Sequence, residues 1–538
     1  MLTTLWLVFL LAEPLPLEGK PAAGFTYDRF RKARNLWQKA CHGHGIAHPA
    51  PKQPGWLVSE WQVTIDLEGH YATPWTTREI PLKVWQAIRE DGTALWQKAE
   101  RERGGQTQYE EVALVSNTAK FQDYGKSAWR TLVEDSEGRE WKSWRRNLDL
   151  LEPQLLLARM AKRLNGLQWL GESPDEPELN VLSWSEENGL VRTLFIHKNT
   201  GLLDRVETLF HHYGFGDQID TIRFSDYRAI AGGQVPFVIK ERRYRDGVGL
   251  ATLWQRRAVE KEQDQPEKHR AIWGGPAELP VPADEFHWSA LGHHVYAVTV
   301  AAHNARVFIV AFADHSVVLD AVGDSQTGEA LLALVAAKLP DQPVTKLVIS
   351  HFHPFYTWGI RPYVQRGVEI ITTPTVEPYL QRVTTNPHAV LPDALFLDPQ
   401  SLNLTLVKES LVLSDGTNHL EIYDIGELSN HTPEYLVTFL PNLKLLIQGD
   451  LLWMRPDRPQ HRASSRARGL HTAIEARELD VQTIGTTIDH ENFLNWVPMA
   501  TLTHAVEGGN GTFDATAHQT EDVTAATRNR PRTKTREP

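Results

Sequence analysis

A short apolar stretch followed by two histidines constrains this chain more than any other feature. Residues 347–349 have the pattern of a buried strand, and Ser350-His351-Phe352-His353 follows them directly. Side chains two positions apart in extended backbone project to the same side, so His351 and His353 are expected to face one site. The chain holds 23 histidines. A single His-x-His pair therefore proves little, and further ligands are needed.

Three further candidate metal ligands each come directly after a predicted strand. They are, in chain order, His431, Asp450 and His490. Open α/β sheets place their sites at the carboxyl ends of strands, where loops from several strands meet. The sequence therefore offers five polar side chains that such a fold can bring together.

The order of these residues resembles the metallo-β-lactamase superfamily. The matching frame is Ser-His-x-His after a strand, a His-Thr-Pro turn at 431–433, Gly-Asp at 449–450 and a late histidine. Strand-like segments between residues 306 and 373 resemble the opening strands of that fold. The resemblance covers roughly residues 285–506. It implies an αββα sandwich, a metal-dependent hydrolase activity and Zn²⁺ as the cofactor.

The resemblance also implies a role for each candidate ligand. His351, His353 and His431 would form the first metal site, and Asp450 would be the carboxylate that bridges to the second. His490 would belong to the second site. Three imidazoles leave one position of a tetrahedral Zn²⁺ open, and such an ion lowers the pKa of its bound water to about 7.

The resemblance breaks down directly after His353. The family signature continues with one residue, then Asp, then His, and ends on paired glycines. The corresponding positions here hold Phe355, Tyr356, Trp358 and Gly359. The second metal site therefore keeps only part of its ligand set, and we expect one Zn²⁺ per chain.

Two functions of different classes remain open. The first is a metal-dependent, mono-zinc hydrolase of a small-molecule ester, lactone, thioester or amide, with Asp450 and Tyr356 as the catalytic residues. Asp450 would orient the bound water, and Tyr356 would either donate a hydrogen bond to a developing oxyanion or simply pack. The second is a non-catalytic protein whose metallo-β-lactamase fold serves as a binding or scaffold module. Resistance to β-lactams would rest on the family name alone, because one fold hosts many functions.

Composition narrows the expected partners. At 538 residues the chain is long enough for two or three domains. Its formal net charge of −11 argues against nucleic acid as a main partner. Cys41 is the one cysteine, so no disulfide within the chain is possible. No apolar run reaches the roughly 20 residues that span a membrane. The oligomeric state stays open.

The first residues indicate export. The apolar run 5–12 has the length of the hydrophobic region of a secretory signal, about 7–15 residues. It lacks a basic start and a clear cleavage site. We expect a periplasmic or secreted protein, and otherwise a cytoplasmic one.

The predicted fold class is α+β, with an antiparallel, half-barrel-like domain and helices ahead of the sandwich. Alternating segments separated by turn signals predict half-buried antiparallel strands in the first half of the chain. Part of this region, at 226–240, loosely resembles the sheet of outer-membrane lipoprotein-sorting domains. The expected divisions are a signal peptide at 1–24, this domain at 25–260, a linker at 261–284, the metallo-β-lactamase-like domain at 285–506 and a disordered tail at 507–538.

Three remaining features receive local interpretations. His211 and His212 end a strand of the first domain and are interpreted as structural, with no partner. Asp320 follows a strand. It is a candidate to accept a hydrogen bond from a metal-binding histidine through the ring nitrogen that does not face the metal. The long basic segment 453–468 is expected to line the mouth of the site.

Overall fold

The structure is a computed structural model. It describes residues 24–46, 55–67, 73–74, 78–90, 94–103, 106–115, 118–122, 130–133, 152–186, 190–212, 214–230, 232–245, 248–262, 286–455, 462–489 and 493–508. The expected signal peptide, linker and disordered tail lie almost entirely outside these residues. The predicted domain divisions therefore stay predictions.

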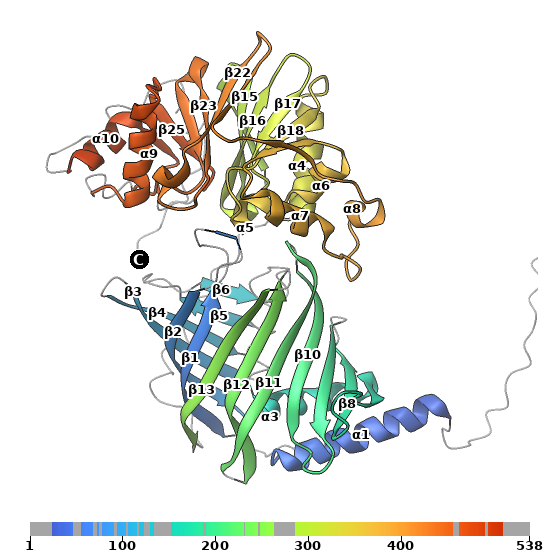
Figure 1. The fold of residues 1–538 in the computed structure, drawn as a ribbon. Coiled ribbons are helices and arrows are strands. Elements are labelled where there is room, and N and C mark those ends of the chain that lie inside the picture. The colour runs from blue at the N-terminus through green and yellow to red at the C-terminus, as the bar shows by residue number, and fades with distance from the viewer. Residues whose placement is uncertain are drawn as a thin grey trace, which may run out of the picture.

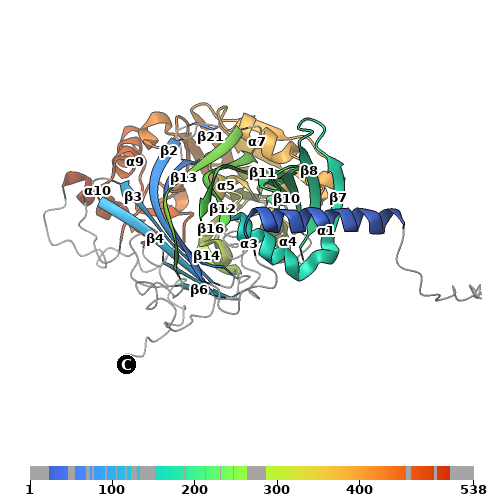
Figure 2. The same cartoon turned by 90° about the horizontal axis from the view of Figure 1, so that it is seen from below.

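One large antiparallel sheet dominates the first half of the described chain. It has thirteen strands, and β1 pairs with β13, so the first and last strands of the sheet in sequence lie side by side at its centre. Figures 1 and 2 show the sheet as a curved half-barrel. The strands are β1 (Trp56–Leu67), β2 (Arg78–Arg89), β3 (Ala94–Arg103), β4 (Gln106–Val115), β5 (Thr118–Gln122), β6 (Arg130–Val133), β7 (Leu167–Glu172), β8 (Leu179–Ser185), β9 (Val191–His197), β10 (Leu203–His212), β11 (Gly216–Ile230), β12 (Gly233–Arg245) and β13 (Val248–Glu262).

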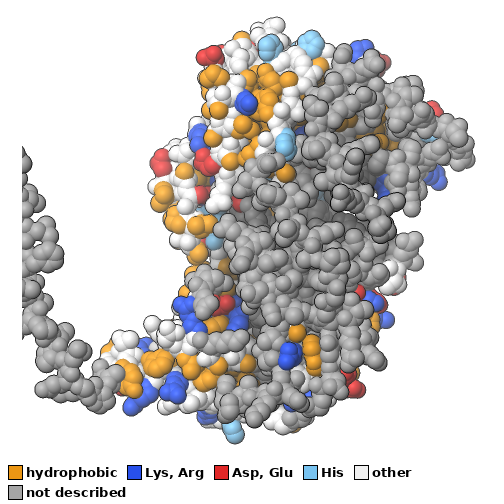
Figure 3. Space-filling view, turned by 180° about the vertical axis from the view of Figure 1, so that it is seen from behind, with side chains coloured by type: hydrophobic (Ala, Val, Ile, Leu, Met, Phe, Trp, Pro, Cys, Tyr) orange, Lys and Arg blue, Asp and Glu red, His pale blue; other side chains and the backbone are white. Residues whose placement is uncertain are grey.

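Two helices, α1 (Phe25–Gly43) and α3 (Pro153–Met160), fill one face of this sheet. Trp37 of α1 donates its indole N–H to the carbonyl oxygen of Leu157 on α3, at 3.0 Å. Both residues belong to a buried apolar cluster that also contains Ile222 and Phe224 of β11. The outer face of α1 carries exposed basic side chains, visible at the lower left of Figure 3.

The second half of the described chain contains two further sheets. The seven-stranded sheet is formed by β14 (Phe286–Gly292), β15 (Val295–Val300), β16 (Ala305–Ala311), β17 (Ser316–Leu319), β18 (Val344–Val348), β19 (Glu369–Thr372) and β20 (Asn403–Leu406). The six-stranded sheet is formed by β21 (Ser410–Ser414), β22 (His419–Asp424), β23 (Leu436–Leu440), β24 (Leu445–Gln448), β25 (Thr483–Thr486) and β26 (Trp496–Pro498).

Helices cover the outer faces of both sheets. A core that includes Phe308 and Ile447 lies between the sheets. Leu331 packs in the outer core of the first sheet, and Leu470 in that of the second. The helices are α4 (Ser325–Lys338), α5 (Pro354–Thr357), α6 (Arg361–Gln365), α7 (Glu377–Thr385) and α8 (Ala394–Leu397) beside the first sheet, with α9 (Ser465–Ala476) and α10 (Met499–Glu507) beside the second. This αββα sandwich, preceded by the antiparallel sheet with helices, confirms the predicted α+β fold class.

The two halves meet where the turn between β10 and β11 enters the sandwich near α7 (Figure 1). The ring of His212 lies 5.1 Å from that of Trp358, and the ring of His211 lies 4.8 Å from that of His388. The interpretation of these two histidines as having no partner is therefore wrong. Trp358 and His388 lie more than 140 residues further along the chain, where no local pattern points to them.

None of the helices within the described residues is long and apolar enough to cross a membrane.

Candidate metal centre

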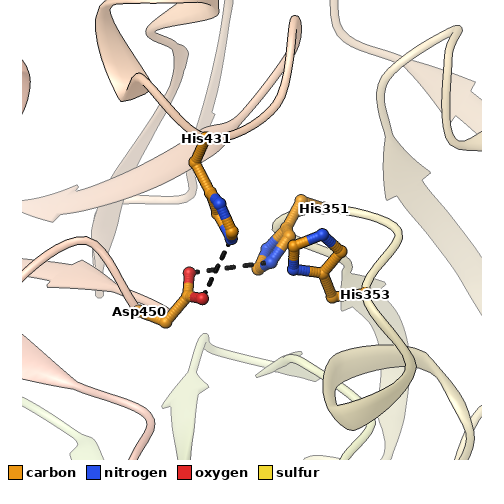
Figure 4. A group of neighbouring side chains, drawn as sticks. All are labelled: His351, His353, His431 and Asp450. Carbon is orange, nitrogen blue, oxygen red and sulfur yellow. Dashed lines mark ion pairs between the residues drawn. The ribbon is translucent and has the colours of Figure 1, made fainter. Parts of the chain in front are cut away.

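The carboxyl ends of three strands bring four of the predicted ligands together. His351 and His353 lie on the loop between β18 and α5. His431 follows β22 and the short helix Gly426–Ser429, and Asp450 follows β24. Figure 4 shows the three imidazole rings and the carboxylate turned toward one point. The fifth predicted ligand, His490, lies outside the described residues.

Distances within this group are those of a compact donor set. One donor atom from each of the four side chains lies within 4.8 Å of all the others. Nε2 of His431 is 2.9 Å from one carboxylate oxygen of Asp450, and Nε2 of His351 is 3.7 Å from the other. The Nε2 atom of His351 makes no hydrogen bond to any described residue. A buried nitrogen in this state, turned toward a carboxylate, is one that a cation would satisfy.

Burial governs the protonation of the group. His351 and His353 are fully buried, and His431 and Asp450 are 8% and 6% exposed. Burial, with the neighbouring His353, lowers the pKa of His351 well below its ordinary value. Burial alone would raise the pKa of Asp450, but contact with His431 and the charge of His351 outweigh it, so that pKa lies below its usual range. These shifts favour a neutral imidazole at His351 and an ionised carboxylate at Asp450, which are the metal-binding forms of the two groups.

Hydrogen bonds on the side of the ring away from the ligand group orient His351. Its Nδ1 lies 3.0 Å from the hydroxyl oxygen of Ser350, and the backbone N–H of Ser350 donates to Asp320 at 2.9 Å. With Nε2 facing the group, Nδ1 carries the proton and donates to Ser350. Asp320 thus acts through Ser350 rather than touching the imidazole itself. Burial, opposed by these hydrogen bonds, raises the pKa of Asp320 to about 7.

Asp450 is held in place by two residues that no sequence motif singles out. The hydroxyl of Tyr435 accepts the backbone N–H of Asp450 at 3.0 Å and donates to its carboxylate at 3.2 Å. Nη1 of Arg466 lies 3.3 Å from the other carboxylate oxygen. Arg466 belongs to the segment 453–468 that was expected to line the mouth of the site. It lies on the first turn of α9 rather than on a loop.

Tyr356 is placed beside the group and deeply buried. Its ring centroid lies 4.4 Å from that of His351, and the ring of Tyr435 stacks on His351 at 4.5 Å. Burial raises the pKa of Tyr356 well above its ordinary value, with Asp450 adding to the effect, and a hydrogen bond with Thr487 works against it. The hydroxyl is therefore protonated at neutral pH. The proposed catalytic role of Tyr356 stays a prediction.

The residues present fit a bound divalent metal ion. Three imidazole nitrogens and one carboxylate oxygen form a donor set that suits Zn²⁺ and other borderline first-row ions. Phe355 and Tyr356 stand where the resembled signature has Asp and His. Phe355 is not ionisable, and Tyr356 offers only a protonated phenol.

Comparisons with known proteins match a family model and several solved structures. Residues 302–494 match the family model described as the metallo-beta-lactamase superfamily. Among solved structures, the chain is similar to a metallo-beta-lactamase from Pontibacter korlensis, with 19% identity, coverage of 41% of this chain and 98% of that one, and a TM-score of 0.31. It is also similar to the mono-zinc form of FIM-1 from Pseudomonas aeruginosa, with 16% identity, coverage of 42% and 96%, and a TM-score of 0.32. A search of curated proteins finds no match.

Proposed function

We propose that this chain is a metal-dependent hydrolase. The premise is that its C-terminal domain belongs to the metallo-beta-lactamase superfamily. Its substrate would be a small molecule with an ester, lactone, thioester or amide bond. The cofactor would be a single Zn²⁺ held by His351, His353 and His431, with Asp450 beside them.

The observation that carries this proposal is the buried convergence of three imidazoles and one carboxylate at the carboxyl ends of β18, β22 and β24. A divalent ion bound there would act as a Lewis acid and make coordinated water acidic near neutral pH. A purely structural cluster of these side chains would leave the buried Nε2 of His351 unsatisfied.

The chain's own residues would then orient the reactants. Asp450 is ionised and accepts hydrogen bonds, so it is suited to align a water molecule and to take its proton. Tyr435 fixes the carboxylate of Asp450, and Ser350 fixes the ring of His351. Arg466 places a positive charge 3.3 Å from the same carboxylate. This charge also favours substrates or transition states that carry negative charge.

One specific observation favours the alternative, a non-catalytic binding or scaffold module. The ring of His351 is enclosed by Tyr356 and Tyr435, and neither His351 nor His353 is exposed. Of the four candidate ligands, only His431 and Asp450 are partly exposed to a substrate. A site this closed would hold an ion for structural reasons unless the surrounding segments open.

Metal analysis followed by substrate screening separates the two functions. Untagged protein purified without added metal should contain about one Zn²⁺ per chain, the content of a single three-histidine site. The loaded protein would then be screened against nitrophenyl esters, lactones and thioesters, with Asp450→Asn as the variant that should lose turnover. One ion with turnover supports the hydrolase, and one ion without turnover supports the module. A chain that binds no ion even with excess Zn²⁺ contradicts the hydrolase and favours the non-catalytic module.

We further propose that the protein works outside the cytoplasm. The support is the apolar run at residues 5–12, which has the length of a secretory signal. Comparing the amino terminus and cell fraction of the expressed protein with those of a variant lacking residues 1–24 would test this.

A further inference from the structure

The turn between β10 and β11 is built into the C-terminal domain rather than resting on it. Phe215, at this turn, is 2% exposed and belongs to the apolar core beneath α4 and α7. Its carbonyl oxygen accepts the side-chain amide of Asn386 at 3.1 Å. The backbone N–H of Asp217 donates to Pro387 at 2.8 Å. Phe215 is thus a core residue of one domain supplied by the other.

A continuous series of aromatic rings leads from Phe215 to the metal centre. The ring centroids of Phe215 and Tyr379 are 6.2 Å apart, and those of Tyr379 and Phe352 are 5.9 Å apart. Phe352 lies between the two histidines in sequence, and its ring is 4.7 Å from that of His353. Each neighbouring pair meets edge to face, an arrangement that stabilises aromatic pairs.

Trp358 makes a second connection between the turn and the histidine loop. It directly follows α5, the single helical turn that begins after His353. Its ring lies 5.5 Å from that of Phe215, and its indole N–H donates to the hydroxyl of Tyr379 at 3.2 Å. The backbone N–H of the next residue, Gly359, donates to Ala321 at 2.8 Å. Phe352 before α5 and Trp358 after it thus both contact Tyr379, which anchors the loop on the two sides of α5.

Gly214 packs directly against the indole ring of Trp358. A Cβ atom at that position would lie 2.4 Å from ring atoms of Trp358. Glycine is thus required for the turn to reach the indole. The position of Trp358 is one at which the resembled family signature has a glycine, so the departure from that signature and the domain contact fall on the same residue.

We infer that the β10–β11 turn is a positioning element of the metal centre, and that Phe215 and Trp358 hold the loop carrying His351 and His353 in its binding geometry. The inference rests on the proposed function, because it concerns the same centre. Protein interiors are packed as densely as organic crystals, so loss of one ring is felt by its neighbours. Two rings separate Phe215 from His353, and each contacts the next directly.

The test uses full-length variants and two measurements. Phe215→Ala removes the first ring, and Phe215→Leu restores most of the volume. Amide hydrogen exchange over residues 350–357, measured on metal-free protein, reports the stability of the loop itself. Chelator competition reports Zn²⁺ affinity, and the visible spectrum of the Co²⁺-loaded protein reports the geometry of the ligands.

The matched control is Phe312→Ala. Phe312 is 1% exposed and lies in the separate core between the two sheets. Phe215→Ala should speed exchange over 350–357 and weaken Zn²⁺ binding about tenfold or more, as loss of supporting residues around metal ligands does. Phe215→Leu should recover most of both, while Phe312→Ala should lower thermal stability without a selective effect on this loop.

Equal effects of Phe215→Ala and Phe312→Ala on the loop would overturn the inference, since Phe215 would then be an ordinary core residue. If Phe215→Ala does not fold, Gly214→Ala is measured instead. The added methyl group of this variant presses on Trp358, while Phe215 stays in place. An unchanged loop in that variant would overturn the inference equally. If the wild-type chain binds no metal, the proposed function fails, and the exchange data still decide whether the turn positions the loop.

Discussion

His388 of the C-terminal domain lies edge-on to His211 of the N-terminal domain, with 4.8 Å between the ring centroids. Nδ1 of His211 is 3.7 Å from a carboxylate oxygen of Asp217, and Nδ1 of His388 is 3.8 Å from one of Asp393. Arg361 binds the same Asp393 with two of its nitrogens. Burial lowers the pKa of His388 to about 4, with the charge of Arg361 adding to the effect, and burial likewise lowers the pKa of His211. Both imidazoles are therefore neutral in the assembled molecule at neutral pH.

The first prediction concerns acid. The unfolded chain binds protons at His388 near its ordinary pKa of 6.5, whereas the folded chain does so only near pH 4. The unfolded state therefore holds more protons in this window, and the stability supplied by the neutral contact is lost as the pH falls from about 6.5 to 4. Thermal unfolding of wild type and His388→Gln across this range should show a shallower pH dependence in the variant. Identical pH dependence in both proteins would show that this contact does not couple to protonation.

The second prediction compares two histidines of the proposed metal centre. His351→Ala should lose most of the bound metal, because it removes one of three converging imidazoles from a fully buried position. His490→Ala should lose little, because sequence resemblance assigns His490 to the incomplete second site. Elemental analysis compares the metal content of both variants with that of His419→Ala. His419 is a partly exposed histidine in the same domain. Equal loss in the first two variants would show that His490 also holds the ion.

The third prediction concerns the hydroxyl of Tyr435. Tyr435→Phe removes both hydrogen bonds to Asp450 and leaves a buried backbone N–H without its acceptor. Loss of a partner for a buried polar group costs about 1–3 kcal/mol. Denaturant unfolding of metal-free protein should show a loss in this range, and Zn²⁺ affinity should fall because Asp450 is less firmly oriented. Tyr363→Phe is the control, since Tyr363 is equally buried but lies away from the centre and its hydroxyl oxygen makes no hydrogen bond within the described chain.

Local patterns explain why much of this fold was predictable. The alternation along β11 places Ile222 and Phe224 inside and Arg223 outside, as the sequence pattern indicates, whereas the apolar Ile219 is exposed. Strand β3 escaped prediction because its sequence, ALWQKAERER, is charged and rich in helix-forming residues. It is held as a strand by its ladders with β2 and β4 rather than by its own composition.

The candidate site was predictable where ligands follow strands in the order of a known motif. His351, His353, His431 and Asp450 were found in this way, and the structure brings them together. The residues that support them follow no such order. Tyr435 and Arg466 reach Asp450 through tertiary packing, and Phe215 reaches Trp358 across 143 positions. Sequence spacing carries no signal for contacts of this kind.

The fourth prediction tests a buried ion pair in the N-terminal domain. Arg256 donates to Glu152, and both side chains are almost completely buried. Glu152→Ala would leave the guanidinium of Arg256 uncompensated, which costs about 3–5 kcal/mol for buried pairs. Asp480→Ala, which breaks the exposed pair with Lys444, should change stability by about 0–1 kcal/mol. Denaturant unfolding would compare the two, and similar small losses would mean that Arg256 finds water or another acceptor.

The fifth prediction concerns the charge of Arg466, which lies 3.3 Å from the carboxylate of Asp450. The guanidinium neutralises part of the negative charge that would otherwise attract a divalent ion, and it repels that ion directly. It also occupies the first turn of α9, where the helix dipole disfavours a cation. Its position therefore opposes metal binding while favouring a negatively charged ligand nearby.

Arg466→Met should consequently bind Zn²⁺ about three- to tenfold more tightly, the size expected for removing one charge near a partly screened ion. Competition with a chelator of known affinity measures the change. Arg468→Met is the matched control, because Arg468 lies on the same helix, is exposed, and donates to the carbonyl of Ala463 instead. Weaker binding in Arg466→Met alone would show that Arg466 chiefly orients Asp450, and that its ordering of the carboxylate outweighs its repulsion of the ion.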